Sequence, residues 1–152
     1  MDLFQHALEV AYRYLGHRDR SVAEVRTRLE REEVAASTID AAVEELGRLG
    51  YLDDARHARC FAEDRRKLDR WGAERIERRL LEAGIAREHI AAALAGQDRE
   101  SELDAAVAVL RRRFPAPPQT DRERERALGL LVRKGYELEL AYDAVRALGR
   151  EP

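Results

Sequence analysis

The stretch LGRLGYLDDARHARCF, residues 46–61, places two adjacent carboxylates behind a Gly-Tyr-Leu turn. Paired acids can share a proton or hold a metal ion when their oxygens converge. Successive helical residues point about 100° apart, so Asp53 and Asp54 cannot converge on one ligand without help from elsewhere. An Asp at a helix start instead accepts hydrogen bonds from unpaired amides at the positive end of the dipole. The pair is therefore predicted to begin a helix and to set an angle between structural units.

Other candidate chemistry is incomplete. His57 and Cys60, three residues apart, would form half of a zinc site, but His6, His17 and His89 are isolated and Cys60 is the single cysteine. The chain has no Gly-x-Ser-x-Gly elbow, no glycine-rich phosphate loop and no His-Glu-x-x-His motif. We therefore expect no catalytic nucleophile, no metal and no cofactor.

Two basic clusters, RRKLDRWG and RRRF, lie beside the aromatic residues Trp71 and Phe114. A cationic strip with an aromatic ring can follow a phosphate backbone and stack a base. The alternative is that the arginines form a solvated face while the two rings fill joints between helices. The run DRERER, residues 121–126, alternates in sign and is typical of a solvent-exposed face laced with ion pairs. The candidate partner or DNA contacts are the basic residues Arg65, Arg66, Lys67, Arg70, Arg111, Arg112, Arg113, Arg133 and Lys134.

The composition predicts that helices position these residues. Charged residues make up 38% of the chain and aromatic residues only 6%, and the abundant Ala, Glu, Arg and Leu are strong helix formers. The 28 basic and 30 acidic residues nearly balance, which argues against binding polyanions through bulk charge alone. No apolar run approaches the ~20 residues that cross a bilayer, and the start MDLFQHALEV has no export signal. We expect an all-α protein of the cytoplasm that has no membrane contact.

The sequence repeats with a period of 51 residues, since Leu29, Leu80 and Leu131 are evenly spaced and apolar neighbours recur with them. A period of this length indicates a tandem array of structural units. Four further columns are apolar in all three copies: Val25, Ile76 and Ala127; Val34, Ile85 and Tyr136; Ile39, Ile90 and Ala141; Val43, Leu94 and Val145.

Each repeat is predicted to contain three helices. The column Glu33, Gly84 and Gly135 holds two glycines, which indicates a helix that ends in a left-handed residue before the next helix begins. An amphipathic stretch precedes each such pair, with its apolar stripe at Leu8, Tyr12 and Leu15 in the first repeat. We expect three tandem three-helix repeats in an elongated, curved stack, with the limits 1–53, 54–98 and 99–152.

Turn and cap residues mark the helix ends. Ser21 is predicted to be an N-cap, and either Thr120 or Asp121 is predicted to start the helix at the end of the proline-rich FPAPPQTD. Gly50 is predicted to close the last helix of the first repeat, with Leu52 packed over the joint.

The segments LGYLDDARHARCFAEDRR, WGAERIERRLLEAGIAREHIAAAL and DRERERALGLLVRKGYELELAYDAV follow ALEVAYRYLGHRDRSVAEVRTRLE in the chain. In that order they resemble RecX, the regulatory protein of the bacterial recombinase RecA, over nearly the whole sequence. The segment from Ser21 through Glu24 to Leu29 is one of its specific pieces. A second specific piece is the run Gly50, Tyr51, Leu52, Asp53 and Asp54, with Ala58 behind it. The remaining pieces are two turns, Gly84 with Ile85 and Gly135 with Tyr136.

The resemblance implies a monomeric, non-enzymatic inhibitor of RecA, without a small-molecule substrate, acting in homologous recombination, DNA repair and the SOS response. Family members bind the RecA filament on DNA, in its groove or at its growing end, and lower its ATPase and strand-exchange activity; some also bind DNA. This sequence lacks the basic leader that some members have, and its net charge is −2, which bears against autonomous DNA binding more than against filament binding. The alternatives are a helical protein that binds single- or double-stranded DNA directly and a helical adaptor for another partner.

Overall fold

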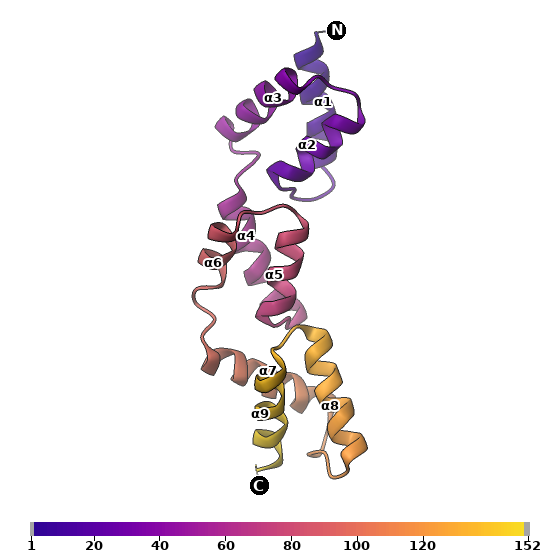
Figure 1. The fold of residues 1–152 in the computed structure, drawn as a ribbon, viewed down its shortest axis with the longest axis vertical. Coiled ribbons are helices and arrows are strands. Elements are labelled where there is room, and N and C mark those ends of the chain that lie inside the picture. The colour runs from indigo at the N-terminus through magenta and orange to yellow at the C-terminus, as the bar shows by residue number, and fades with distance from the viewer. Residues whose placement is uncertain (1, 151–152) are drawn as a thin grey trace. The chain divides into compact units, whose positions relative to one another are not determined.

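The computed structural model describes residues 2–150, which form nine α-helices and one short π-helical segment (Figure 1). No strand is present among these residues, so the all-α prediction is confirmed. The α-helices are α1 (Leu3–Leu15), α2 (Val22–Arg31), α3 (Ala36–Arg48), α4 (Asp54–Asp64), α5 (Ala73–Glu82), α6 (Arg87–Leu94), α7 (Arg99–Arg113), α8 (Asp121–Lys134) and α9 (Leu138–Gly149), and the π-helical segment is η1 (Arg65–Asp69).

The chain divides into two compact units. The first contains Met1–Cys60 and Leu80–Ala92, and the second contains Phe61–Arg79 and Ala93–Pro152. The division falls inside α4, α5 and α6, so the helices of the middle predicted repeat belong partly to each unit. The three repeat limits proposed from the sequence stay a prediction.

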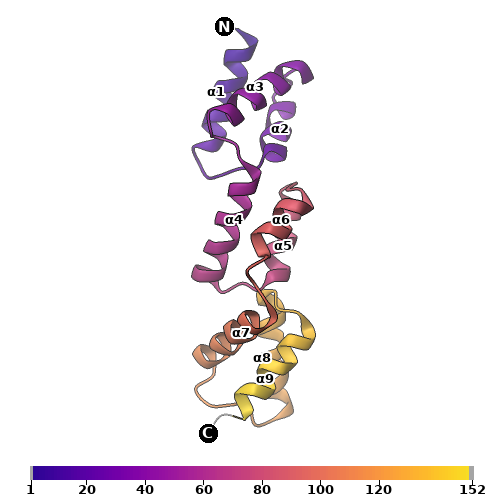
Figure 2. The ribbon, with the colours of Figure 1, turned by 90° about the vertical axis from the view of Figure 1, so that its left-hand side faces the viewer.

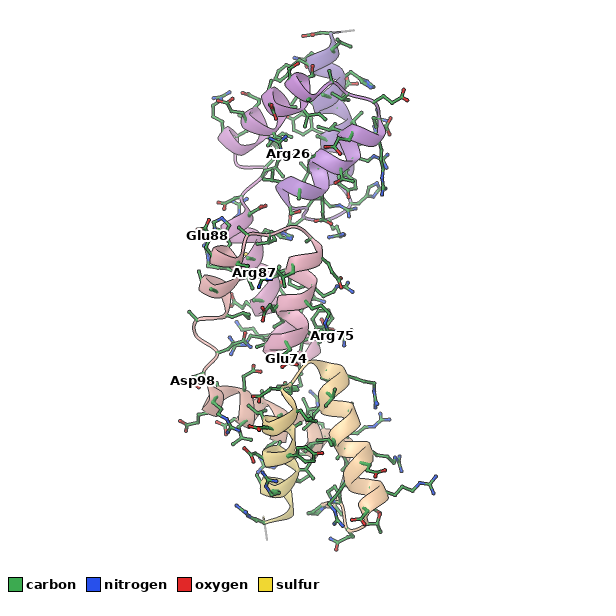
Figure 3. All side chains as sticks on the ribbon, in the orientation of Figure 1. Arg26, Glu74, Arg75, Arg87, Glu88 and Asp98 are labelled. Atoms are coloured by element: carbon green, nitrogen blue, oxygen red, sulfur yellow. The ribbon has the colours of Figure 1, made fainter. Side chains whose placement is uncertain are left out.

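In the first unit, α1, α2 and α3 each pack against the other two (Figures 1 and 2). Three alanines without exposed surface, Ala7, Ala11 and Ala42, let these helices approach closely. On the surface, Arg26 of α2, which is labelled in Figure 3, pairs through its guanidinium with Asp40 of α3 at 2.8 Å, an exposed ion pair of small energetic value. The buried core of this bundle consists of Ala7, Leu8, Val10, Ala11, Val25, Leu29, Ile39, Ala42, Leu46 and Leu52.

In the second unit, α7, α8 and α9 form an equivalent bundle. Tyr136 is its largest fully buried side chain, and its hydroxyl donates to the carbonyl of Arg70 at 2.9 Å, so the polar end of the ring is not left unpaired. Burial raises the pKa of the Tyr136 hydroxyl. The core consists of Ala106, Val107, Val109, Leu110, Ala127, Leu131, Tyr136, Leu140, Ala141, Ala144, Val145 and Leu148.

The 51-residue period is visible in the backbone. Glu33, Gly84 and Gly135 all have positive φ, at 61°, 78° and 100°. After each of them, the next N–H donates to the carbonyl five residues earlier, which satisfies an unpaired carbonyl at the helix end. The three bonds run from Val34 to Leu29 at 3.1 Å, from Ile85 to Leu80 at 3.1 Å and from Tyr136 to Leu131 at 3.0 Å.

The predicted apolar columns form buried faces, whereas the apolar stripe predicted on the first helix has one exposed member. Leu29, Leu80 and Leu131 are at most 1% exposed. The prediction that Tyr12 belongs to this apolar stripe is wrong, because Tyr12 is 38% exposed. Its ring lies edge-on to that of Tyr51, with centroids 5.2 Å apart, because Ala7 and Ala11 occupy the inward face of α1.

The predicted caps are confirmed at three helix starts. Ser21 forms a capping box, because its hydroxyl accepts from the N–H of Glu24 and the Glu24 carboxylate accepts from the N–H of Ser21. Of the two candidates before α8, Thr120 is the cap, accepting from the N–H of Glu123 at 3.1 Å. Asp53 accepts from the N–H of Arg56 at 3.0 Å and so caps α4.

Within the first unit, the start of α2 is bound to the turn between α5 and α6 and to the start of α4. The backbone of Gly84 lies against Ala23 so closely that a Cβ on this glycine would be 2.5 Å from the Ala23 Cβ. Two hydrogen bonds complete the joint: the Ser21 hydroxyl donates to the carbonyl of Ala83, and the N–H of Val22 donates to the carboxylate of Asp54.

Within the second unit, the start of α5 is bound in the same way to the turn between α8 and α9 and to α7. A Cβ on Gly72 would be 2.5 Å from the carbonyl oxygen of Gly135, so only glycine fits this approach. Two of its donors, Gly72 and Ala73, lie 51 residues beyond Ser21 and Val22, the donors of the first joint. The third donor is the next residue, Glu74, which is labelled in Figure 3 at the start of α5. The bonds run from the N–H of Gly72 to the carbonyl of Lys134, from Ala73 to the Glu102 carboxylate and from Glu74 to the carbonyl of Gly135.

Candidate partner-binding groove

Two adjoining hollows open on the second unit, with volumes of about 340 Å³ and 380 Å³. Arg113 and Leu130 line both, so the hollows form one continuous surface, which we call the basic groove. Its lining residues come from the end of η1, the end of α7 and one face of α8: Leu68, Asp69, Arg70, Val109, Arg112, Arg113, Phe114, Arg122, Glu125, Arg126, Leu130, Arg133 and Lys134.

Helix α8 supplies one wall of the basic groove. Arg122, Arg126, Leu130 and Arg133 follow one another at intervals of four, four and three residues, which places them on one helix face. The other side of α8 faces the core through Ala127 and Leu131. The buried stripe therefore determines which arginines point into the groove.

The last turn of α7 supplies Arg112 and Arg113. Basic residues are favourable there because the unpaired carbonyls make this end of the helix negative. The helix ends at Phe114, whose N–H donates to the carbonyl of Leu110 at 2.8 Å. The Phe114 ring is half-buried and packs against the core of the α7–α9 bundle.

The third wall comes from the end of η1. Arg70 has a φ of 56°, a left-handed conformation that is uncommon outside glycine and costs on the order of 1 kcal/mol or more. Three hydrogen bonds hold this backbone in place. The N–H of Trp71 donates to the carbonyl of Arg65 at 3.1 Å, the ammonium of Lys134 to the carbonyl of Asp69 at 2.8 Å, and the Tyr136 hydroxyl to the carbonyl of Arg70.

The basic groove has a large excess of positive charge, with seven basic and two acidic lining residues. Of the two carboxylates, that of Asp69 is already paired with Arg65. The other is that of Glu125. Guanidinium groups form bidentate hydrogen bonds with carboxylates and phosphates, so the groove is suited to an anionic ligand. Five of its arginines make no ion pair with any residue that the structure describes: Arg112, Arg113, Arg122, Arg126 and Arg133.

The structure brings together five of the nine basic candidates and leaves four outside the groove. Arg65 is bound to Asp69, and Lys67 to Glu63 at 2.6 Å, so these two charges are already compensated. Arg66 is half-buried, and Arg111 is exposed without lining either hollow. The five candidates that line the groove are Arg70, Arg112, Arg113, Arg133 and Lys134.

Sequence reasoning missed Arg122 and Arg126. The alternating signs of DRERER predict an exposed face laced with ion pairs, and Arg124 is paired with Asp121 at 2.5 Å. Arg122 and Arg126 are exposed as predicted, but they line the groove and form no ion pair with any residue that the structure describes. The spacing of Arg122, Arg126 and Arg133 along one helix face could have identified them.

The two aromatic residues of the basic clusters have structural positions. The Trp71 ring is covered by the guanidinium of Arg75, 4.0 Å from its centroid, and meets the edge of Phe61 with centroids 6.0 Å apart. Trp71 lines neither hollow, and Phe114 packs on the core. This arrangement agrees with rings that fill joints between helices.

The acids at residues 53 and 54 are helix-start residues, as the sequence predicted. The hydrogen bond from the N–H of Arg56 holds the pKa of the Asp53 carboxyl below its usual value. Asp54 is the first residue of α4 and accepts from Val22. Across residues 2–150, no group of three or more His, Cys, Asp or Glu side chains could hold a metal ion. No helix in this range is long and apolar enough to cross a membrane.

Two protein-family models match this chain. The model described as RecX, first three-helix domain, matches residues 7–46, and the model described as RecX, second three-helix domain, matches residues 53–94. Together they cover more than half of the sequence. Of the residues that line the basic groove, Leu68, Asp69 and Arg70 lie within a matched region, and the others follow it in the chain.

Curated relatives are named regulatory protein RecX. That of Listeria monocytogenes (serotype 4a, strain HCC23) is 29% identical over 147 residues, covering 94% of this chain and 54% of the relative. That of Thermobifida fusca (strain YX) is 29% identical over 147 residues, covering 95% of this chain and 80% of the relative. This chain thus spans about half the length of the Listeria proteins that it matches.

Two solved structures share the fold. The crystal structure of RecX from Lactobacillus salivarius has a TM-score of 0.81 and 18% identity, and the match covers 97% of each chain. A crystal structure of regulatory protein RecX has a TM-score of 0.75 and 19% identity, covering 96% of this chain and 72% of the other. At this level of identity the two structures support an all-α repeat fold.

Proposed function

The chain belongs to the RecX family, and on this premise we propose that it is a regulator that binds filaments of the recombinase RecA on DNA and inhibits them. The observation that supports this proposal most directly is the match of both RecX three-helix domain models. The protein acts as a monomer in the cytoplasm, without catalysis of its own. Its effect is to lower the ATPase, extension and strand-exchange activities of the filament.

Inhibition requires only occlusion under this proposal. A tandem helical repeat presents many side chains to a filament built of repeating protomers. The basic groove supplies the electrostatic part of that contact, since its unpaired arginines complement carboxylates or phosphates on the filament. Bound protein then blocks the addition of protomers or the movements that accompany ATP hydrolysis.

The basic groove also supports a second candidate function, direct binding to DNA. Lys and Arg side chains that neutralise phosphates release counterions, so binding of this kind weakens steeply as salt is raised. Filament inhibition with weak, salt-sensitive binding to bare DNA favours the first function. Tight binding to bare DNA without an effect on the filament favours the second.

The ATPase rate of RecA filaments pre-formed on single-stranded DNA tests the proposal. The rate is expected to fall as the protein is added, and binding to the same bare DNA is measured in the same salt. An unchanged ATPase rate at saturating protein would contradict the proposal.

The contribution of the basic groove is tested by a charge reversal. A variant with Arg112→Glu, Arg113→Glu and Arg126→Glu is expected to need about ten-fold more protein for the same inhibition. The control has the same change in net charge at exposed positions outside the groove, Arg59→Glu, Arg78→Glu and Arg87→Glu. Circular dichroism checks that both variants are folded. Equal inhibition by the two variants would exclude the groove from the contact.

A further inference from the structure

The basic groove contains apolar side chains among its charges. Leu68 lies at its edge and is 72% exposed, one of the two most exposed large apolar side chains of residues 2–150. Leu130 is half-buried between the two hollows, and Val109 lines the hollow next to Leu68. Val109 is already buried in the core, so a ligand gains hydrophobic free energy, in addition to ion pairs, by covering Leu68 and the exposed part of Leu130.

The groove offers little to a nucleic-acid base. Single-stranded nucleic acids gain much of their affinity from bases stacked on aromatic rings. Phe114 is the single aromatic residue among the described lining residues, and it is half-buried against the α7–α9 core. Trp71 is outside the groove and already covered by Arg75.

The positive charge of the larger hollow of the groove is interrupted by one carboxylate. Glu125 lies among Arg122, Arg126 and Arg133 in the larger hollow. A phosphodiester backbone would bring a phosphate towards this carboxylate, whereas a polypeptide can place a neutral or basic residue there. The aliphatic and guanidinium surfaces together match a segment that is mainly acidic and carries an apolar side chain.

We infer that the basic groove binds an acidic polypeptide segment of a protein partner, whose carboxylates pair with Arg113 and Arg126 and whose apolar side chain packs on Leu68. This inference rests on the proposed function, because it assumes a protein partner. It goes further in specifying the chemistry of the partner's contact surface. The guanidinium pairs give orientation, and contact with Leu68 discriminates against other polyanions.

Three fluorescent probes of equal negative charge test the inference by anisotropy in one buffer. The first is a peptide of Glu and Asp with Leu at every fourth position, the second has Ser in place of Leu, and the third is a deoxythymidine oligonucleotide. The Leu peptide is expected to bind about ten-fold more tightly than the Ser peptide, because one buried leucine contributes about that factor. It is also expected to bind more tightly than the oligonucleotide.

Matched variants locate the binding. Leu68→Ser is expected to remove the preference for the Leu peptide, whereas Leu138→Ser, at an exposed leucine on α9, retains it. The pair Arg113→Glu and Arg126→Glu is expected to weaken both peptides at least about ten-fold, whereas Arg87→Glu leaves them unchanged.

Two results would overturn the inference. The first is that the oligonucleotide binds most tightly of the three probes and that the Arg113→Glu and Arg126→Glu variant no longer binds it. That result would make the groove a nucleic-acid site. The second is equal binding of the two peptides, which removes the apolar contact. The RecA ATPase assay is independent of these measurements. If the Leu peptide binds as expected while the protein fails to inhibit RecA filaments, the groove chemistry stands and the proposed partner is wrong.

Discussion

The carboxylate of Asp54 accepts a hydrogen bond at 3.0 Å from the backbone N–H of Val22, 32 residues earlier in the chain. Val22 is the first residue of α2, and Asp54 is the first residue of α4. The same arrangement recurs in the second unit, where Glu102 of α7 accepts at 3.0 Å from the N–H of Ala73, the first residue of α5. In each case an acid near the start of a later helix satisfies an unpaired amide at the start of an earlier one.

The acid at residue 54 should therefore contribute to stability across helices. We expect Asp54→Ala to lower the free energy of unfolding by about 1–2 kcal/mol, because the N–H of Val22 loses its partner. The measurement is urea unfolding followed by circular dichroism. Asp104→Ala, at an exposed position on α7, is the control and should change little. Equal effects of the two variants would show that the bond between Asp54 and Val22 contributes nothing.

Ser21 should be more sensitive to change than other serines. Its side chain has no exposed surface, caps α2 and donates to the carbonyl of Ala83. Ser21→Ala is expected to cost about 1–3 kcal/mol in urea unfolding, since both the cap and a buried carbonyl lose their partner. Ser37→Ala, at an exposed position in the first turn of α3, serves as the comparison. A cost no larger than that of Ser37→Ala contradicts the prediction.

The close approach at Gly72 predicts a steric effect on folding. A Cβ there would be 2.5–2.7 Å from the backbone of Gly135 and Tyr136, which cannot rotate away. Gly72→Ala is expected to cost about 2 kcal/mol or more, measured as a lower midpoint of urea unfolding. Gly96→Ala, where nothing lies within 4 Å of the added Cβ, should not lower the midpoint. A Gly72→Ala variant as stable as the parent would mean that Gly72 lies further from the backbone of Gly135 and Tyr136 than 2.5–2.7 Å implies.

Glu102 should make stability depend on pH. Its carboxyl is buried, and desolvation raises its pKa above the ordinary value of 4.5, although the N–H of Ala73 and the charge of Arg66 lower it in part. Because the folded state binds the proton more tightly, this contribution is fully present below the unfolded pKa and is lost as pH rises through the folded pKa.

The variant Glu102→Gln removes this titration. The stability of the parent relative to Glu102→Gln is expected to increase as pH falls from 7 towards 4.5, as measured by urea unfolding at several pH values. Glu100→Gln, at an exposed position on the same helix, should show no such trend. A parallel pH dependence for the parent and Glu102→Gln would contradict a raised pKa at this site.

The repeat pattern and the local ends of the helices could be predicted from the sequence. Gly84 and Gly135 indicated left-handed helix ends because an L side chain is strained at positive φ, and both have positive φ in the structure. Ser21 and Thr120 indicated caps because their hydroxyls accept from amides only three residues away. Apolar columns at a period of 51 indicated the buried faces, since burial follows helical periodicity. These are local properties, and each depends on a few neighbouring residues.

Tertiary structure decided which distant groups meet. The sequence identified Asp54 as a helix-start residue but not Val22 as its partner, because that contact depends on how α2 and α4 pack. It identified Arg112 and Arg113 as candidates and missed Arg122 and Arg126, which face the same groove only because α8 turns its apolar stripe towards α7 and α9. Periodicity specifies which side of a helix is buried. Convergence of exposed charges depends on the direction and rotation of each helix relative to its neighbours, and that is a property of the packed core.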